Sequence, residues 1–528
     1  MEYKIFFLVI MIFISTLLTM LGNRLRIAYP VLLVLAGLVI SFLPYVPGNE
    51  IDPGIIFYIF LPPLLYMSAM LLPLKDVLSW KRVILSFAFL VVFLTAAGVG
   101  LLAYWLVPGM TLAMGMMLGG ILSSTDAVSA TTIMQQVKVP TRISSILEGE
   151  SLFNDASSLI TFSFALVAVQ TGSFVLEKAF ITFLWLVFGG GIIGIIIGMI
   201  FVKLHKLIPD KDPNATIIFT IIAPYLMYIV AEMAGTSGVL GVVCGGFYMG
   251  RHTHVLDANS RMMGRSVWSN IVFVLNGLAF MLIGLNLPQI IEGMEANGMS
   301  VTKGTVFGII VLAAIMLIRM VCAFVAIPIS RIRRKRHHLG YDLILDAPSA
   351  FIIGWCGMRG VLSLAAALSI PYMLSNGTSF PQRSLILYCT FIVILGTLVI
   401  QGLSLPLFLK HIHFPKYGDH LSDNETYCII RKGLAECSLK YLEEHPAENE
   451  EDSRVFDYFK NRWEERLAIN SKDSVFKSIV KTYSEILVKQ RDYLYRLNNE
   501  RKDISEEIIR DFVRSIDMEE ERLKIEEE

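Results

Sequence analysis

The chain has 528 residues, of which 55% are hydrophobic and 17% are charged. A soluble domain of this size could not bury so much apolar surface, so the composition excludes a soluble globular protein and indicates a membrane protein. The formal net charge is zero, and its meaning therefore depends on which loops carry the charges.

Apolar segments of roughly 17 to 25 residues recur along residues 1–410, and each is long enough to cross about 30 Å of hydrocarbon. They predict an all-α membrane protein with about thirteen transmembrane helices. We interpret the first as a retained helix, because no small-residue cleavage site follows it. The predicted spans are 4–20, 27–43, 54–72, 83–107, 111–134, 146–170, 180–202, 215–234, 236–250, 267–288, 304–330, 346–371 and 384–408.

Basic residues are shared unequally between the alternate loops that this assignment creates, with eighteen in one set and four in the other. Because lysine and arginine favour the cytoplasmic side, the N-terminus is predicted outside a plasma membrane and the residues after Lys410 in the cytoplasm. We interpret the run RIRRKR (331–336) as part of this signal, so no nucleic-acid partner is expected. The larger set is Arg24, Arg26, Lys75, Lys81, Arg82, Lys138, Arg142, Lys203, Lys206, Lys211, Arg251, Arg261, Arg265 and the basic residues of 331–336; the smaller is Lys4, Lys178, Lys303 and Arg383.

Two spans are interrupted by polar or glycine-rich sequence near mid-membrane depth. The fifth contains SSTDAVSA (123–130), and the twelfth contains GWCGMRGVLS (354–363). Interruptions at corresponding places in two halves of a chain predict inverted repeats with two discontinuous helices that cross at a substrate site. Asp126 and Arg359 have suitable signs to balance the partial charges at the facing half-helix ends.

The segment EGESLFND (148–155) brings polar groups into the sixth span. A charge at mid-bilayer costs a few kcal/mol or more, so such residues usually face a watery cavity and mark an ion or proton path. A small cation that loses its water needs oxygen ligands. If spans five and six are adjacent, Asp155, Ser151, Thr125 and backbone carbonyls can supply these ligands.

Asp155 is expected to hold either a cation or a proton, and this competition would couple the two fluxes. Its neighbour Asn154 is neutral. With one exchangeable carboxylate, a single positive charge of either kind crosses in each direction, which predicts an electroneutral cycle.

Glu150 would disturb this charge balance if it were free, and Arg319 in the eleventh span would be costly against lipid. A structural ion pair between Glu150 and Arg319 resolves both problems. The alternative is that Arg319 extends toward the cytoplasmic interface.

Residues 411–528 are polar and nearly free of glycine and proline, which predicts a cytosolic helical domain. Its apolar residues recur every three to four positions, as in amphipathic helices that pack on each other or on a second subunit. A structural role is favoured over ligand binding, and a regulatory role stays open. These positions are Val475, Ile479, Ile486, Leu487, Ile504, Ile508, Ile509, Phe512 and Ile516.

The six cysteines form no CxxC pair and no run of histidine ligands accompanies them. Neither a disulfide framework nor a zinc or haem site is therefore expected, and no cofactor is predicted.

The motifs TDAVSA, EGESLFND and GMRGVLSLA, together with Arg319, occur in an order that resembles the monovalent cation:proton antiporter-1 family, which includes bacterial NhaP-type sodium/proton exchangers. The resemblance covers the whole membrane part. One departure is Ala127, where the family usually has proline after the aspartate of the fifth span.

This resemblance implies a thirteen-helix fold in which a six-helix core domain moves against a dimerisation domain, within a homodimer. The core would comprise spans 83–170 and 304–408, and the dimerisation domain spans 1–72 and 180–288. It also implies that Asp155 carries the ion or proton with Asn154 as its partner, that Ser151, Thr125 and Asp126 contribute to the site, and that Glu150 pairs with Arg319.

The predicted function is secondary-active exchange of Na⁺ for H⁺ by alternating access, without enzymatic chemistry. Exchange of K⁺ or Li⁺ by the same mechanism stays open. A cation channel is a rival, although it would need a carbonyl filter or a ring of charges. An intramembrane aspartyl protease would use Asp126 and Asp155 as paired acids, but no GxGD sequence surrounds either residue. A transport-inactive scaffold or sensor is a further alternative.

Overall fold

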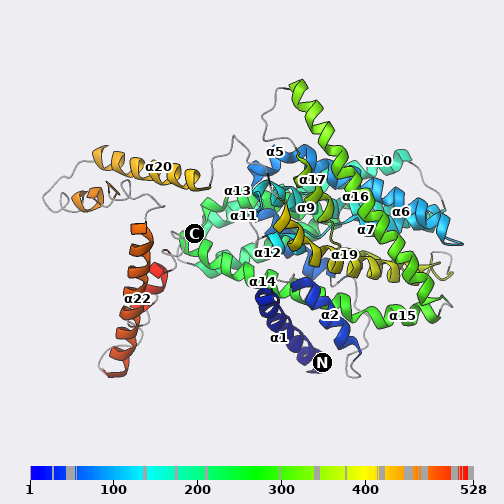
Figure 1. Ribbon diagram of the computed structural model, residues 1–528, viewed down its shortest axis with the longest axis horizontal. Coiled ribbons are helices and arrows are strands. Elements are labelled where there is room, and N and C mark those ends of the chain that lie inside the picture. The colour runs from blue at the N-terminus through cyan, green and yellow to red at the C-terminus, as the bar shows by residue number, and fades with distance from the viewer. Residues whose placement is uncertain are drawn as a thin grey trace. The chain divides into compact units, whose positions relative to one another are not determined.

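The first part of the chain is a bundle of helices, as the computed structural model shows (Figure 1). The structure describes residues 2–25, 29–42, 54, 56–134, 139–172, 176–208, 212–296, 299–337, 345–374, 377–412, 414, 423–444, 456–461, 463–464, 474–500, 509, 512–513, 515–520 and 522. Within these residues the only extended pairing is an isolated bridge between Met373 and Ser379. The all-α prediction is confirmed for this described part.

The chain divides into two units, Met1–Lys416 and Tyr417–Glu528. Helices cover each of the predicted spans in the first unit. They are α1 (Glu2–Leu25), α2 (Tyr29–Ser41), η1 (Ile56–Phe60), α4 (Leu61–Leu71), α5 (Leu74–Leu85), η2 (Ser86–Val91), α6 (Val92–Leu106), α7 (Leu112–Ser123), α8 (Ala127–Met134), α9 (Thr141–Thr171), α10 (Leu176–Leu184), η3 (Trp185–Gly189), α11 (Gly190–Leu207), α12 (Pro213–Met233), α13 (Gly238–Arg251), η4 (Thr253–Val255), α14 (Ala258–Leu285), α15 (Leu287–Ala296), α16 (Val301–His337), α17 (Ala347–Trp355), α18 (Val361–Leu368) and α19 (Arg383–His411).

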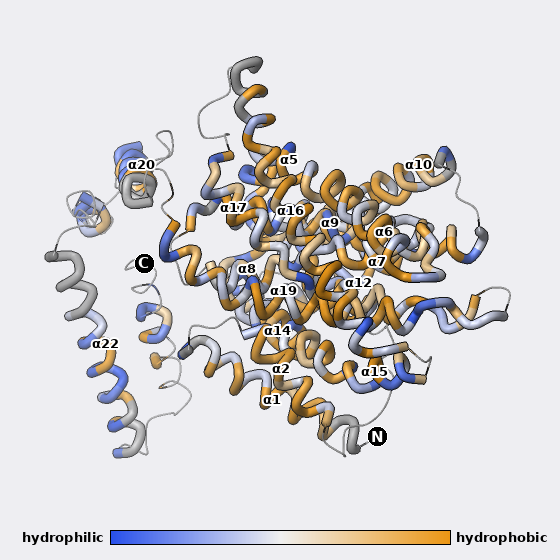
Figure 2. Tube along the Cα trace, turned by 45° about the vertical axis from the view of Figure 1, so that its right-hand side comes forward, coloured by the Kyte–Doolittle hydropathy of each residue, from blue (hydrophilic) through white to orange (hydrophobic). Residues whose placement is uncertain are grey.

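Among the described residues, eight helical segments are long and apolar enough to cross a membrane, and 6–22, 29–41 and 57–71 form shorter apolar helices. Hydrophobic residues predominate along the helices of this unit (Figure 2). The protein is therefore a multi-pass membrane protein.

Several helices extend beyond the apolar windows that predicted them. α9 begins at Thr141 rather than at 146, α14 begins at Ala258 rather than at 267, and α16 continues to His337 rather than ending at 330. The Asp257 carboxylate caps α14 by accepting the Ser260 N–H at 3.2 Å, which satisfies one of the free amides at the helix start. Hydropathy finds only the part of such a helix that lies in lipid.

Some of the basic residues that predicted the orientation lie outside the described part of the chain. These are Arg26, Lys138 and Lys211, together with the side chains of Lys4, Lys178, Arg331 and residues 333–336.

Two local features bring α6, α7 and α9 close together. Gly119 of α7 lies against α6, where an added Cβ would be 2.6 Å from the Ala96 Cα. Between α5 and α6, the π-helical segment η2 leaves the Ala88 carbonyl to accept a hydrogen bond from the Ser157 hydroxyl of α9. The neighbourhood of the EGESLFND segment is thus fixed by tight backbone packing.

The second unit contains α20 (Asp423–Glu444) and α22 (Ser474–Glu500). Arg491 of α22 forms ion pairs with Asp517 at 2.6 Å and Glu520 at 2.5 Å, and Leu487 and Ile509 are buried. Amphipathic helical segments therefore pack on each other here. Of the apolar positions predicted from periodicity, Ile504 and Ile508 and the side chains of Val475 and Ile479 lie outside the described residues.

Candidate functional site

Two helix breaks meet inside the first unit. α7 ends at Ser123 and α8 begins at Ala127, while α17 ends at Trp355 and α18 begins at Val361. The Asp126 N–H between α7 and α8 donates to the Met358 carbonyl between α17 and α18, at 2.8 Å. Backbone groups that lose their helical partners at one break are thus satisfied at the other.

A buried arginine lies at the carbonyl end of α7. The Arg359 guanidinium, 1% exposed, donates to the Ser123 and Ser124 carbonyls, each at 2.7 Å. The last carbonyls of a helix lack intrahelical partners and carry partial negative charge. Arg359 therefore neutralises the end of α7, and its backbone N–H is held by the Thr397 hydroxyl of α19 at 3.1 Å.

Asp126 lies at the amide end of α8. One carboxylate oxygen accepts the Val128 N–H at 3.0 Å and the other accepts the Ser129 hydroxyl at 2.9 Å. A Cβ added to Gly360, which precedes α18, would lie 3.2 Å from the same carboxylate. The negative charge of Asp126 therefore lies beside the positive ends of two half-helices.

Asp155 of α9 faces the first break. It is 8% exposed, and one carboxylate oxygen accepts the Ser124 hydroxyl at 2.5 Å. Ser151, one turn earlier, donates its hydroxyl to the Thr125 carbonyl at 2.8 Å and accepts the Ala127 N–H at 3.3 Å. α9 thus presents a carboxylate and a hydroxyl to the unwound residues between α7 and α8.

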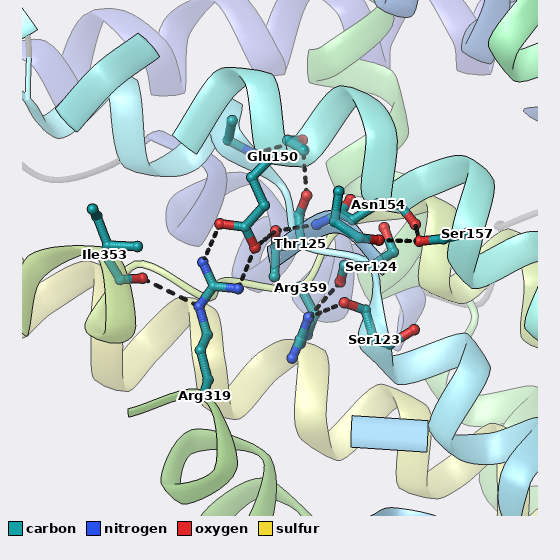
Figure 3. Close-up of polar contacts among 12 residues, drawn as sticks. Ser123, Ser124, Thr125, Glu150, Asn154, Ser157, Arg319, Ile353 and Arg359 are labelled. Carbon is teal, nitrogen blue, oxygen red and sulfur yellow. Dashed lines mark hydrogen bonds and ion pairs between the residues drawn. The ribbon is translucent and has the colours of Figure 1, made fainter. Parts of the chain in front are cut away.

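Asn154 is fully buried beside this carboxylate. Its amide nitrogen donates to the Thr125 hydroxyl at 2.6 Å, and its amide oxygen has no hydrogen-bond partner among the described residues. Its backbone carbonyl accepts the Ser157 hydroxyl at 3.1 Å. Figure 3 shows Asn154 and Thr125 side by side, with Ser124 next to them.

Glu150 and Arg319 form a bidentate ion pair between α9 and α16 (Figure 3). Their side chains are 1% and 4% exposed, and the second Arg319–Glu150 bond measures 2.9 Å. The Arg319 Nε also donates to the Ile353 carbonyl at 3.2 Å. With both charges neutralised, the pair adds no net charge to the site.

The structure brings all of the sequence-predicted site residues to the two breaks and the α9 face opposite them. It differs in one detail from the expected ligand set, because the Thr125 hydroxyl contacts Asn154 and lies 3.5 Å from Glu150, whereas Ser124 contacts Asp155. Sequence reasoning did not single out Ser124 or Ser157. Their hydroxyls lie in otherwise apolar spans, which is the signal that could have indicated them.

Comparisons with known proteins decide the family. The family described as "Sodium/hydrogen exchanger, transmembrane" matches residues 9–411. The chain belongs to this family. All of the site residues described above lie within the part that matches the sodium/hydrogen exchangers.

Curated relatives and a solved structure agree with this assignment. The chain is 31% identical over 400 residues to a "Sodium, potassium, lithium and rubidium/H(+) antiporter" of Bacillus subtilis, covering 73% of this chain but only 58% of that relative. It is 30% identical over 439 residues to the "Uncharacterized Na(+)/H(+) exchanger YjcE" of Escherichia coli, covering 81% of this chain and 80% of that protein. The sodium proton antiporter MjNhaP1 of Methanocaldococcus jannaschii has the same fold, with a TM-score of 0.59 at 18% identity over 77% of this chain and 97% of that one.

Ala127 is the first residue of α8 and contacts α9. The helix breaks before Ala127 although no proline is present there. Alanine keeps a backbone N–H, which proline lacks, and this N–H donates to the Ser151 hydroxyl. This hydrogen bond links the break to α9.

Proposed function

We propose that this protein exchanges a monovalent cation, with Na⁺ as the physiological ion, for H⁺ by alternating access. The observation that carries the proposal is the Asp155 carboxylate, which is 8% exposed and faces the unwound residues between α7 and α8. A dehydrated cation there can take oxygen ligands from Asp155, Ser124 and Ser151. Asp126 contributes by holding the start of α8 in place.

The exchange arises from competition for Asp155. The carboxylate binds a cation or a proton but not both, so a carrier that changes its accessible side only when loaded couples the two fluxes. Asn154 is neutral, and the Glu150 charge is cancelled by Arg319. One exchangeable negative charge therefore carries one positive charge in each direction, which makes the cycle electroneutral.

The names of the relatives support a monovalent cation as substrate. The Bacillus subtilis antiporter is named for sodium, potassium, lithium and rubidium, and NhaH of Halobacillus dabanensis, 28% identical over 420 residues, is named for Na⁺/H⁺ exchange. The Bacillus name favours K⁺/H⁺ exchange by the same site as the second candidate. A direct comparison of Na⁺, K⁺ and Li⁺ in one assay separates them.

The surrounding architecture follows from the same proposal. The protein spans the plasma membrane about thirteen times, with its N-terminus outside and residues 411–528 in the cytoplasm. A core of spans 83–170 and 304–408, arranged as inverted repeats with two crossing broken helices, moves against a dimerisation domain of spans 1–72 and 180–288 in a homodimer. The basic residues of the alternate loops support the orientation.

Flux in proteoliposomes tests the exchange. An imposed Na⁺ gradient should drive proton movement in the opposite direction, at a rate that does not change when the membrane potential is clamped at different values. A flux that rises with voltage supports a channel or unequal stoichiometry, and cleavage of a membrane peptide supports the protease. Absence of any cation-coupled proton flux contradicts the proposal.

A further inference from the structure

A hollow of about 270 Å³ lies in the first unit, apart from the two helix breaks. It is partly open, and residues of α4, α11, α12, α13 and α14 and of the short segment between α13 and α14 line it. None of its lining residues belongs to α7, α8, α9, α17 or α18, which carry the exchange site. It is therefore a separate feature of the molecule.

The charge of this hollow has one sign. Its lining includes Arg261, Arg265, His205 and His252 but no aspartate or glutamate. The two arginines are four residues apart on α14, so they share one helix face. Neither has a carboxylate partner within the part of the chain that the structure describes, although the Arg261 guanidinium donates to the Leu256 carbonyl.

The first turn of α14 contains a buried hydroxyl. Ser260, 2% exposed, belongs to the lining, but its hydroxyl is closed to solvent and lies against the Asp257 carboxylate. The Asp257 carboxylate is occupied as the cap of α14. The guanidinium donors of Arg261 and Arg265, in the first turns of α14, favour an anion.

Another part of the lining is apolar and aromatic. Tyr66 is fully buried and Trp268 is 2% exposed, and their rings are 5.2 Å apart. Leu71, also in the lining, is 54% exposed. A hollow lined both by arginines and by apolar and aromatic side chains suits an anion with an attached carbon skeleton.

We propose that the hollow binds a phosphate ester, with the phosphate held by Arg261 and Arg265 and its carbon skeleton against Met67 and Trp268. Arginine recognises phosphate through paired N–H donors. The volume is slightly below the roughly 300–1,000 Å³ of pockets for drug-sized ligands, so the hollow fits a headgroup-sized molecule rather than a dinucleotide. Such a ligand is either a soluble phosphate ester or the headgroup of an anionic phospholipid.

Thermal unfolding of the purified full-length protein in an uncharged detergent tests the proposal. The probes are inorganic phosphate, glycerol 3-phosphate and mixed micelles that contain phosphatidylglycerol or, as the neutral comparison, phosphatidylcholine. A ligand that binds only the folded state raises the apparent Tm, and we expect a rise of about 2 °C or more at saturation. A rise with glycerol 3-phosphate assigns a soluble ligand, whereas a rise with phosphatidylglycerol alone assigns a lipid.

Two variants and a matched control locate the binding. R261Q/R265Q removes the two positive charges of the hollow. Gly264→Leu fills part of the hollow without changing its charge. There is room for this side chain, because a Cβ at Gly264 meets only Ile217, at 3.8 Å. R251Q/K206Q removes the same charge from exposed positions outside the lining. R261Q/R265Q and Gly264→Leu should each lose most of the ligand-induced rise in apparent Tm, and the control should keep it.

The proposal is overturned if no probe shifts the wild-type protein, if Gly264→Leu responds like wild type, or if the control loses as much as R261Q/R265Q. Melting without ligand shows that each variant is folded. Because the readout is unfolding and not transport, the result is independent of the exchange proposed above.

Discussion

The Glu150 carboxylate and the Arg319 guanidinium face each other in a bidentate ion pair that links α9 to α16 almost without exposure to solvent. Removing one member of such a pair leaves an uncompensated buried charge, which costs about 3–5 kcal/mol. We therefore expect Glu150→Gln and Arg319→Gln each to lower the stability of the folded protein strongly. The double variant E150Q/R319Q, in which two neutral amides face each other, should recover part of that loss.

Thermal unfolding of the four proteins in one detergent measures this cycle. A double variant that loses as much stability as the two single variants together would show that the charges do not depend on each other.

Gly357 should be required because Arg319 passes directly over it. A Cβ at Gly357 would lie 2.5 Å from the Arg319 Cδ and 2.8 Å from its Nε. This side chain cannot move aside freely, since it is held by Glu150 and by the Ile353 carbonyl. We expect Gly357→Ala to cost about 1–3 kcal/mol of stability, as overpacking usually does.

Gly433→Ala is the control for this change, because nothing lies within 4 Å of a Cβ at that helical position. It should leave the apparent Tm unchanged or raise it slightly. If Gly357→Ala and Gly433→Ala both had the apparent Tm of the wild type, the Arg319 side chain would be free to move aside.

Ser124→Ala tests whether the Ser124 hydroxyl is a ligand beside Asp155. The hydroxyl contacts the Asp155 carboxylate at 2.5 Å, and a hydrogen bond to a charged group contributes about 1.5–3 kcal/mol. We expect the KM for the cation to rise about tenfold or more, with a smaller change in kcat. Initial rates of exchange over a range of Na⁺ concentration provide the measurement.

Ser158→Ala is a suitable comparison, because that hydroxyl is equally buried but donates to the Asp155 backbone carbonyl at 3.0 Å. Its KM should stay near the wild-type value. Equal rises in both variants would indicate a general loss of packing instead of a lost ligand.

Ala127→Pro should be tolerated. Proline is favourable at the first position of a helix, and the residue before it, Asp126, is already non-helical. The cost is one hydrogen bond to Ser151, about 1 kcal/mol. Val128→Pro instead removes a bond to the Asp126 carboxylate and should lose much more transport activity and stability. If Ala127→Pro were the more damaging of the two, the bond to Ser151 would be the stronger constraint.

The helices and the two breaks could be predicted from the sequence, because a helix in lipid must be long enough to cross it and must satisfy the hydrogen bonds of its backbone. Polar groups such as Asp126 and Arg359 stand out in apolar spans. The structure places Asp126 in the first break and Arg359 in the second, with the Arg359 guanidinium at the carbonyl end of α7. The sequence alone could not show whether Ser124 or Thr125 is the neighbour of Asp155. Adjacent residues in an unwound segment point in different directions, and only the backbone geometry decides which one meets α9.

The π-helical segments were also beyond prediction. In η2 the Ala88 carbonyl is satisfied by Ser157, a contact between residues far apart in the chain. The polar first turn of α14 was missed for a related reason, because its start depends on the Asp257 cap and not on hydropathy.

Proton release on cation binding tests the central claim most directly. When Na⁺ is added to the purified protein in weakly buffered solution, the wild type should release up to one proton per chain, and Glu148→Gln, which neutralises another carboxylate of α9, should release the same amount. Asp155→Asn should release none. Equal proton release from Asp155→Asn and wild type would contradict the claim that one carboxylate binds the two ions in competition.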